Sequence, residues 1–195
     1  MKRFCFLKQT SLLALATLLC SMTFPVPMSA GDQPTAIEKP SMKIAVTSTA
    51  FTEGHSIPKL HAFDDKNLSP ALQWTGVPPE ANSLALICDD PDAPMGTWVH
   101  WLLYDLPPTT AGLSEGVPKS PELTNGTKQG LNDFKQIGFG GPMPPPGKPH
   151  RYYFKLYALD TMLNLKPGIT KKELLRAMEG HVLAEGELMG IYQRK

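Results

Sequence analysis

The segment that most restricts the fold of this chain is a short apolar run at residues 83–88, with the sequence Ser-Leu-Ala-Leu-Ile-Cys. Turn-forming residues enclose the run, with Gly76, Pro78 and Pro79 before it and Pro91 after it. The run is too short for a typical helix, and its apolar residues are consecutive rather than alternating. We therefore predict a β-strand that is covered on both faces, within a layered domain.

Other segments show the alternation or the aromatic and β-branched content that is typical of strands. Residues 98–106 and 151–160 are the longest of these segments, and residues 57–63 are a weaker candidate. The remaining expected strands are residues 42–48, 72–74 and 186–192. Together these segments predict a mostly β domain, built as a sandwich or as a packed pair of sheets.

The period of two along a strand predicts which side chains share a face. In the first long strand, one expected face carries Trp98, His100, Leu102 and Tyr104, and the other carries Val99, Trp101, Leu103 and Asp105. In the second, one expected face carries His150, Tyr152, Phe154 and Leu156, and the other carries Arg151, Tyr153, Lys155 and Tyr157.

One helix is expected near the end of the chain. Thr170 is suited to be its N-cap, and Glu173 three residues later completes a capping box. The expected apolar stripe of this helix consists of Leu174, Leu175, Met178 and Val182. Residues 107–149 are rich in Gly and Pro, so we expect them to form long surface loops, which often carry function.

The first 30 residues differ from the rest of the chain. Lys2, Arg3 and Lys8 form a basic start, and an apolar run at residues 11–20 follows. This run is shorter than the roughly 20 residues that a membrane-spanning helix needs, so residues 1–30 resemble a secretory signal peptide rather than an uncleaved anchor. We expect residues 31–41 to be a flexible lead-in and residues 42–195 to be the domain. The protein is then periplasmic or secreted, and the mature domain does not span a membrane.

Charge and cysteine content restrict the possible functions. Removal of residues 1–30 takes away three basic residues and no acidic ones, which leaves 16 basic against 18 acidic residues. Such a balance lacks the basic surface that nucleic-acid binding requires. Only Cys88 would remain in the exported protein, so no internal disulfide can form and the core must hold the fold.

The loop after the apolar run contains three carboxylates, Asp89, Asp90 and Asp92. Asp-Pro-Asp is a good turn sequence by itself and needs no ligand. Three neighbouring carboxylates repel one another, however, so we expect an Asp–His or Asp–Arg contact, with Arg151 as one candidate partner. The bond before Pro94 is a candidate cis peptide, and the sequence leaves its state open.

Two histidines are candidates for a binding site. His100 lies among apolar residues, which is equally typical of a buried histidine that bonds to the backbone. His150 directly follows a Pro- and Gly-rich loop and shares its expected strand face with Tyr152, so both side chains can project into a pocket. We find no nucleophile elbow, phosphate-binding loop, zinc-binding helix or C-x-x-C pair, and we therefore expect no catalytic residue, metal or cofactor.

Three separated motifs occur in a specific order: Asp90-Pro91-Asp92-Ala93-Pro94, then Trp98-Val99-His100, then residues 141–147 leading into His150-Arg151-Tyr152. This combination closely resembles the phosphatidylethanolamine-binding protein family, and within it the bacterial Raf-kinase-inhibitor-like branch. The resemblance implies a large antiparallel sheet packed on a smaller one, with one or two peripheral helices. Where the branch commonly has a cysteine in the proline-rich loop, this chain has Met143, so a reactive thiol is not expected there.

The resemblance also implies a small anion pocket at one end of the sheet. Its ligand-binding residues here would be Asp90, Pro94, His100, His150 and Tyr152. Structural support would come from Asp92, Arg151, Gly141 and Pro142.

The expected function is that of an exported binding protein for a small anion, such as phosphate or a phosphoethanolamine-like group, that acts as an inhibitor or signalling modulator. One alternative is a hydrolase in which His100 or His150 is a general base oriented by Asp90. Another is a protein-interaction module that acts through the loops of residues 107–149. The sequence leaves the protein partner and a homo-oligomeric state open.

Overall fold

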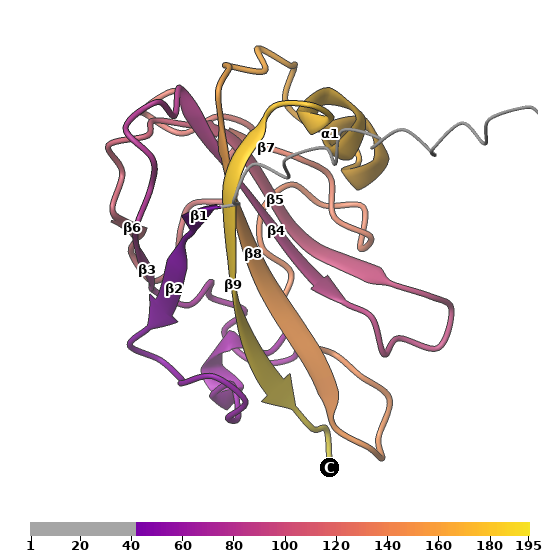
Figure 1. Cartoon of the computed structure of the whole chain (residues 1–195). Coiled ribbons are helices and arrows are strands. Elements are labelled where there is room, and N and C mark those ends of the chain that lie inside the picture. Colours follow the sequence, from indigo (N-terminus) through magenta and orange to yellow (C-terminus); the bar gives the residue numbers. More distant parts are fainter. Residues whose placement is uncertain (1–41) are drawn as a thin grey trace, which may run out of the picture. The chain divides into compact units, whose positions relative to one another are not determined.

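The computed structural model describes residues 42–195, which contain two β-sheets, one α-helix and one short 3₁₀ helix (Figure 1). The large sheet has six strands in the order β1-β9-β8-β4-β5-β7, and the small sheet has the order β2-β3-β6. All strand pairs are antiparallel except β1 with β9. The strands of the large sheet are β1 (Met42–Lys43), β4 (Ser83–Asp90), β5 (Trp98–Leu106), β7 (Lys128–Gln129), β8 (His150–Leu159) and β9 (Val182–Tyr192). Those of the small sheet are β2 (Ala45–Ser48), β3 (Leu72–Thr75) and β6 (Gly112–Leu113).

Strand β4 lies inside the large sheet, and all eight of its residues are buried. Its even-numbered side chains, such as Leu86, join the core between the two sheets, which also contains Trp74 of the small sheet. Its odd-numbered side chains, such as Ile87, pack with Leu174 of helix α1 (Lys171–Met178) on the other side. The helix and the small sheet therefore cover opposite faces of the large sheet (Figure 1), as the apolar run predicted.

Strand β5 departs from the predicted alternation because it contains a bulge. Cys88 of β4 pairs with Trp101, whereas the next residue, Asp89, pairs with Val99, so His100 is an extra residue on β5. Trp98 and His100 share a face as predicted. Beyond the bulge the faces exchange: Trp101 packs in the core between the sheets, and Leu102 packs on the side of the helix. The prediction that His100 shares a face with Leu102 and Tyr104 is therefore wrong.

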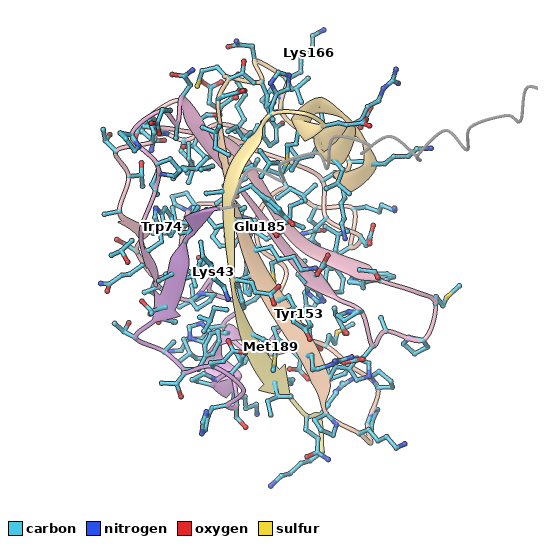
Figure 2. The ribbon with its side chains drawn as sticks, in the orientation of Figure 1. Lys43, Trp74, Tyr153, Lys166, Glu185 and Met189 are labelled. Atoms are coloured by element: carbon cyan, nitrogen blue, oxygen red, sulfur yellow. The ribbon has the colours of Figure 1, made fainter. Side chains whose placement is uncertain are left out.

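Strand β8 follows the predicted alternation along its whole length. Tyr152, Phe154 and Leu156 are buried in the core between the sheets, whereas Arg151 is exposed on the opposite face. Figure 2 shows Tyr153 on this opposite face and Trp74 on the small sheet.

Two expected strands differ from the prediction. Residues 42–48 form two strands that belong to different sheets: Lys43 pairs with Glu185 of β9 (Figure 2), and Ala45 pairs with Thr75 of β3. Residues 57–63 form the 3₁₀ helix η1 (Lys59–His61) rather than a strand. Pro58 immediately precedes this helix, and its fixed φ and missing N–H favour a helical turn over a ladder position.

Helix α1 begins as predicted, with both bonds of the capping box between Thr170 and Glu173 present. It ends at Met178, and Gly180 then adopts a φ of +80°, which suits a glycine after a helix C-terminus. Val182 therefore lies in β9 rather than on the helix, and Leu175 is exposed. The expected loops of residues 107–149 contain the two short strands β6 and β7.

The expected signal peptide and lead-in, residues 1–41, lie outside the described residues. Within residues 42–195, no helix combines the length and the apolar character needed to cross a bilayer. Cys88 is buried, and this burial raises the pKa of its thiol well above the usual value, with the neighbouring carboxylate of Asp89 as a further cause. The thiol is therefore held in its neutral form, as expected of a core residue.

Candidate functional site

A cavity of about 320 Å³ lies at the end of the large sheet where β4 ends and where β5 and β8 begin. The loop between β4 and β5 and the loop before β8 lie at this same end (Figure 1). All five predicted ligand-binding residues line the cavity. The lining residues are Asp90, Ala93, Pro94, Met95, Trp98, His100, Phe134, Met143, Pro144, Pro145, His150 and Tyr152.

The floor of the cavity contains a buried pair, Asp90 and His150. The His150 Nδ1–H donates to Asp90 Oδ2 over 2.8 Å, and the two residues are 8% and 3% exposed, respectively. The other oxygen, Asp90 Oδ1, accepts from the backbone N–H of Asp92 at 2.8 Å. The backbone bond holds the carboxylate of Asp90 in place, and the bond to Nδ1 fixes the ring orientation of His150. The Nε2 atom of this ring remains available to other partners.

Asp92 supports this floor from the outside. Its Oδ2 accepts from the backbone N–H of Arg151 at 3.0 Å and from Nε at 2.9 Å, and its Oδ1 accepts from Nη2 at 2.7 Å. The Arg151 hydrogen bond is the main cause that lowers the pKa of Asp92 to about 2. Both predicted contacts of this loop, Asp–His and Asp–Arg, are therefore present, and they attach it to the start of β8.

His100 is 2% exposed, and its Nδ1 lies 2.6 Å from the carbonyl oxygen of Gly140. A carbonyl oxygen can only accept, so the proton of the neutral ring is on Nδ1 and Nε2 carries the lone pair. Burial lowers the pKa of His100 below its usual value, although the Gly140 bond and the charge of Asp90 partly oppose this shift. Both interpretations of His100 from the sequence therefore apply. It is a buried histidine bonded to the backbone, and it also lines the cavity.

Two donors in the cavity wall have no hydrogen-bond partner within the described part of the chain: the Tyr152 hydroxyl and the Trp98 Nε1–H. Both groups are buried. Burial raises the pKa of Tyr152, and the charge of Asp90 and the closeness of its carboxylate to the hydroxyl raise it further, so the hydroxyl keeps its proton. The geometry of this approach does not meet the criteria of a hydrogen bond. Buried polar groups in native proteins are nearly always bonded, so two such donors beside one cavity mark a place where an acceptor can bind.

Gly141 and Pro142, the expected structural residues, hold the loop before β8 against residues 61–67. A Cβ on Gly141 would overlap the carbonyl oxygen of His61, so only glycine allows this close approach. The Gly141 N–H donates to Asn67 Oδ1 at 2.8 Å, and the Pro142 carbonyl accepts from Phe63 N–H at 3.0 Å. These contacts fix the loop that forms one side of the cavity.

The sequence analysis did not assign several residues that line or support the cavity. Phe134 stacks on Phe63 at 4.3 Å between ring centroids, and its edge contacts Trp98 and His100. The signal for Phe134 was weak, because only its position in a long loop pointed to function. The role of Asn67 depends on a contact 74 residues away and has no local signal.

Other open points concern the peptide bond before Pro94 and a metal site. The Ala93–Pro94 peptide bond is trans. In residues 42–195, no three His, Cys, Asp or Glu side chains gather as a metal-binding group. The lining of the cavity contains hydrogen-bonding groups, the Asp90–His150 pair and apolar side chains.

The fold and the site define a class: a protein of two packed β-sheets with a His- and Asp-lined pocket at the end of the larger sheet. The sequence model of the family "Phosphatidylethanolamine-binding protein" matches residues 47–193. The chain therefore belongs to the phosphatidylethanolamine-binding protein family, whose members bind small ligands.

Relatives and solved structures agree with this assignment. A UPF0098 protein of Methanothermobacter thermautotrophicus is 53% identical over 145 residues, which are 74% of this chain and 95% of the relative. A UPF0098 protein of Aquifex aeolicus is 46% identical over 76% of this chain and 88% of its own length.

Two crystal structures share the fold. Escherichia coli YbcL, described as a member of the mammalian PEBP family, is 33% identical with a TM-score of 0.73, and the match covers 78% of this chain and 99% of that one. CT736 of Chlamydia trachomatis, solved as a PEBP homologue, is 42% identical with a TM-score of 0.71, over 80% and 100% of the two chains.

Proposed function

We propose that the cavity binds a small oxyanion, and that the natural ligand carries a phosphate or phosphate-like group. The observation that carries this proposal is the pair of buried, unpartnered donors, the Tyr152 hydroxyl and the Trp98 Nε1–H, beside one cavity. An oxyanion supplies several acceptors at once and can satisfy both donors. The name of the family points in the same direction, because the headgroup of phosphatidylethanolamine contains a phosphate.

The Asp90–His150 pair makes an anion acceptable despite the buried carboxylate. Both oxygens of the Asp90 carboxylate accept hydrogen bonds, from His150 Nδ1–H and from the backbone N–H of Asp92, and these bonds offset its negative charge towards a ligand. His150 bonds Asp90 through Nδ1, so Nε2 is the ring atom that remains for a ligand. Neutral His100 adds an acceptor at Nε2, which suits a protonated ligand oxygen.

Binding explains this site better than covalent catalysis does. None of the residues that line the cavity is a serine, threonine or cysteine, the side chains that an adjacent histidine most often activates as nucleophiles. A pocket that binds without turnover suits a carrier, a sensor or an inhibitor.

The decisive experiment is calorimetric titration of the domain with inorganic phosphate and with phosphoethanolamine. Tyr152→Phe removes one hydroxyl that has no hydrogen-bond partner among residues 42–195. We therefore expect phosphate affinity to fall about tenfold, as for the loss of one bond to a charged group, with unchanged stability. His150→Ala is expected to abolish measurable binding.

The matched control is His181→Ala. His181 also bonds an aspartate, Asp160, over 2.8 Å, but this pair is exposed and does not line the cavity. Its loss should leave phosphate affinity unchanged. Unchanged affinity in Tyr152→Phe and His150→Ala, or an equal loss in His181→Ala, would overturn the proposed site.

We also propose, from residues 1–30 alone, that the protein is exported to the periplasm or secreted. Cell fractionation of the full chain and of a variant that lacks residues 2–30 tests this proposal. If the protein is exported, only the full chain should be found outside the cytoplasm, and the exported form should lack its N-terminal residues. An equal distribution of both forms would contradict it.

A further inference from the structure

The mouth of the cavity differs in chemistry from its floor. Two short segments form the mouth: Ala93-Pro94-Met95 from the loop after β4, and Met143-Pro144-Pro145 from the loop before β8. We call these six residues the apolar rim. None of their side chains carries a charge or a hydrogen-bonding N–H or O–H group.

The two methionines of the apolar rim are unusually exposed. Met95 is 93% exposed and Met143 is 41% exposed, and they are two of the five large hydrophobic side chains exposed in residues 42–195. Isolated exposed apolar side chains are common and need no explanation. Here, however, both methionines come from separate loops and line one cavity whose floor is polar.

The loops present these side chains on a stiff backbone. Pro94 precedes Met95, and Pro144 and Pro145 follow Met143; each proline ring fixes its own φ angle, and Pro144 also restricts the backbone of Met143 before it. Gly141 and Pro142 attach the second loop to residues 61–67. The side chains of the methionines remain flexible, and thioethers adapt to apolar groups of varied shape. The apolar rim therefore has a stiff backbone and two flexible methionine side chains that can adapt to a ligand.

The size of the cavity also exceeds the need of a bare oxyanion. Its volume of about 320 Å³ lies at the lower end of the range for small-molecule sites, roughly 300–1,000 Å³. A phosphate held by the floor leaves room towards the mouth. A substituent on that phosphate would lie between Met95 and Met143.

We propose that the apolar rim is a specificity subsite, and that the preferred ligands are phosphomonoesters with an aryl or alkyl substituent rather than inorganic phosphate or esters with a polar substituent. This inference rests on the proposed function, because the floor must first hold the phosphate. Each methylene that leaves water contributes about 0.8 kcal/mol, or about fourfold in affinity. A phenyl group that is only partly buried at an open mouth should therefore add about tenfold.

The test compares four ligands by calorimetry at one pH and one ionic strength: inorganic phosphate, phosphoethanolamine, butyl phosphate and phenyl phosphate. We expect phenyl and butyl phosphate to bind about tenfold more tightly than inorganic phosphate, and phosphoethanolamine to gain little. The readout is the ratio of the Kd of inorganic phosphate to that of phenyl phosphate. This ratio should fall from about ten to below about two in the double variant Met95→Ser/Met143→Ser.

Two further variants distinguish lost contacts from a general disturbance. Met95→Leu/Met143→Leu keeps the apolar surface and should keep most of the ratio. Met162→Ser changes a methionine that is also exposed, at 42%, but does not line the cavity, and it should leave the ratio unchanged.

The outcomes separate this inference from the proposed function. If inorganic phosphate binds but phenyl phosphate binds no more tightly, or if the double serine variant keeps the full ratio, the apolar rim is not a subsite, whereas the oxyanion site stands. If none of the four ligands binds, the proposed function itself fails. Tighter binding of phosphoethanolamine than of butyl phosphate would assign the mouth to a cationic group instead.

Discussion

Asp89 and Asp90 are adjacent on β4, yet their environments on the two faces of the large sheet differ. Asp89 points to the helix side, where it accepts from Lys155 Nζ at 2.9 Å and from Lys171 Nζ at the start of α1. Asp90 points to the cavity, where its side-chain partner among residues 42–195 is the imidazole of His150. Both carboxylates are almost fully buried, at 1% and 3% exposure.

The difference between these faces shows how a structural carboxylate is distinguished from one at a binding site. On the helix side, two ammonium groups satisfy Asp89 and connect α1 to the sheet. On the cavity side, two donors in the wall, the Tyr152 hydroxyl and the Trp98 Nε1–H, have no hydrogen-bond partner within the described residues. Burial and charge alone do not separate the two aspartates, whereas the remaining hydrogen-bonding capacity around them does.

The largest expected effect is on stability and belongs to Asp89→Asn. This change leaves two lysines beside a neutral partner, and breaking a buried ion pair typically costs 3–5 kcal/mol. Because the lysine side chains are 30% and 25% exposed, we expect a smaller loss of about 2 kcal/mol in the free energy of unfolding, measured by urea denaturation. Phosphate affinity should change less than twofold.

The control for this prediction is Asp92→Asn, which removes the same charge from a more exposed pair with Arg151. Surface pairs contribute roughly 0–1 kcal/mol. If the free energy of unfolding falls equally in the two variants, the contacts of Asp89 with two lysines contribute no more to stability than a surface ion pair does.

The second effect is a loss of stability in acid that depends on His100. Burial lowers the pKa of His100 in the folded protein, so below about pH 6.5 the unfolded chain binds the proton more readily. Stability from this group is complete above the unfolded pKa and falls as the pH decreases towards the folded pKa, by at most about 1.4 kcal/mol per pH unit.

Urea denaturation between pH 7.5 and 5.5, without phosphate, should therefore show a steeper decline for the wild type than for His100→Gln. Parallel pH profiles would show that the ring is solvated or already charged. Either result distinguishes the two faces of the sheet, because the side chains that bond Asp89 within residues 42–195 are lysines, which do not titrate in this pH range.

The smallest effect is expected for Asp90→Asn. The amide oxygen can still accept from His150 Nδ1–H, but the amide nitrogen cannot accept from the Asp92 backbone N–H. We expect a loss of about 1 kcal/mol, as for one hydrogen bond, in the same urea experiment. A loss larger than that of Asp89→Asn would reverse the distinction between the two faces.

Local sequence signals predicted those elements whose cause is local. The apolar run predicted β4, the capping box predicted the start of α1, and the loop after β4 together with His150 and Tyr152 pointed to the site. The two lysines that neutralise Asp89 are 66 and 82 residues away, so only the tertiary structure brings them together. Asn67 and Phe134 support the cavity in the same non-local way.

Other differences arose where two local rules competed. Residues 57–63 have strand-like composition, but Pro58 favours the turn of η1. Alternation along residues 42–48 gave no sign that the chain passes from one sheet to the other at Ile44. The bulge of β5 also left no signal in the sequence, because an extra residue in a strand does not change the types of residue that the strand contains.

That bulge decides which side chains of β5 share a face of the large sheet. On one side of it, Trp98 and His100 face the cavity, and on the other, Trp101 and Leu103 belong to the core. In a strand of strict alternation, the even-numbered Trp98 and His100 would lie on the face opposite to the odd-numbered Trp101 and Leu103. The extra residue resets the alternation, so one face of the large sheet forms both the cavity wall and the packed core.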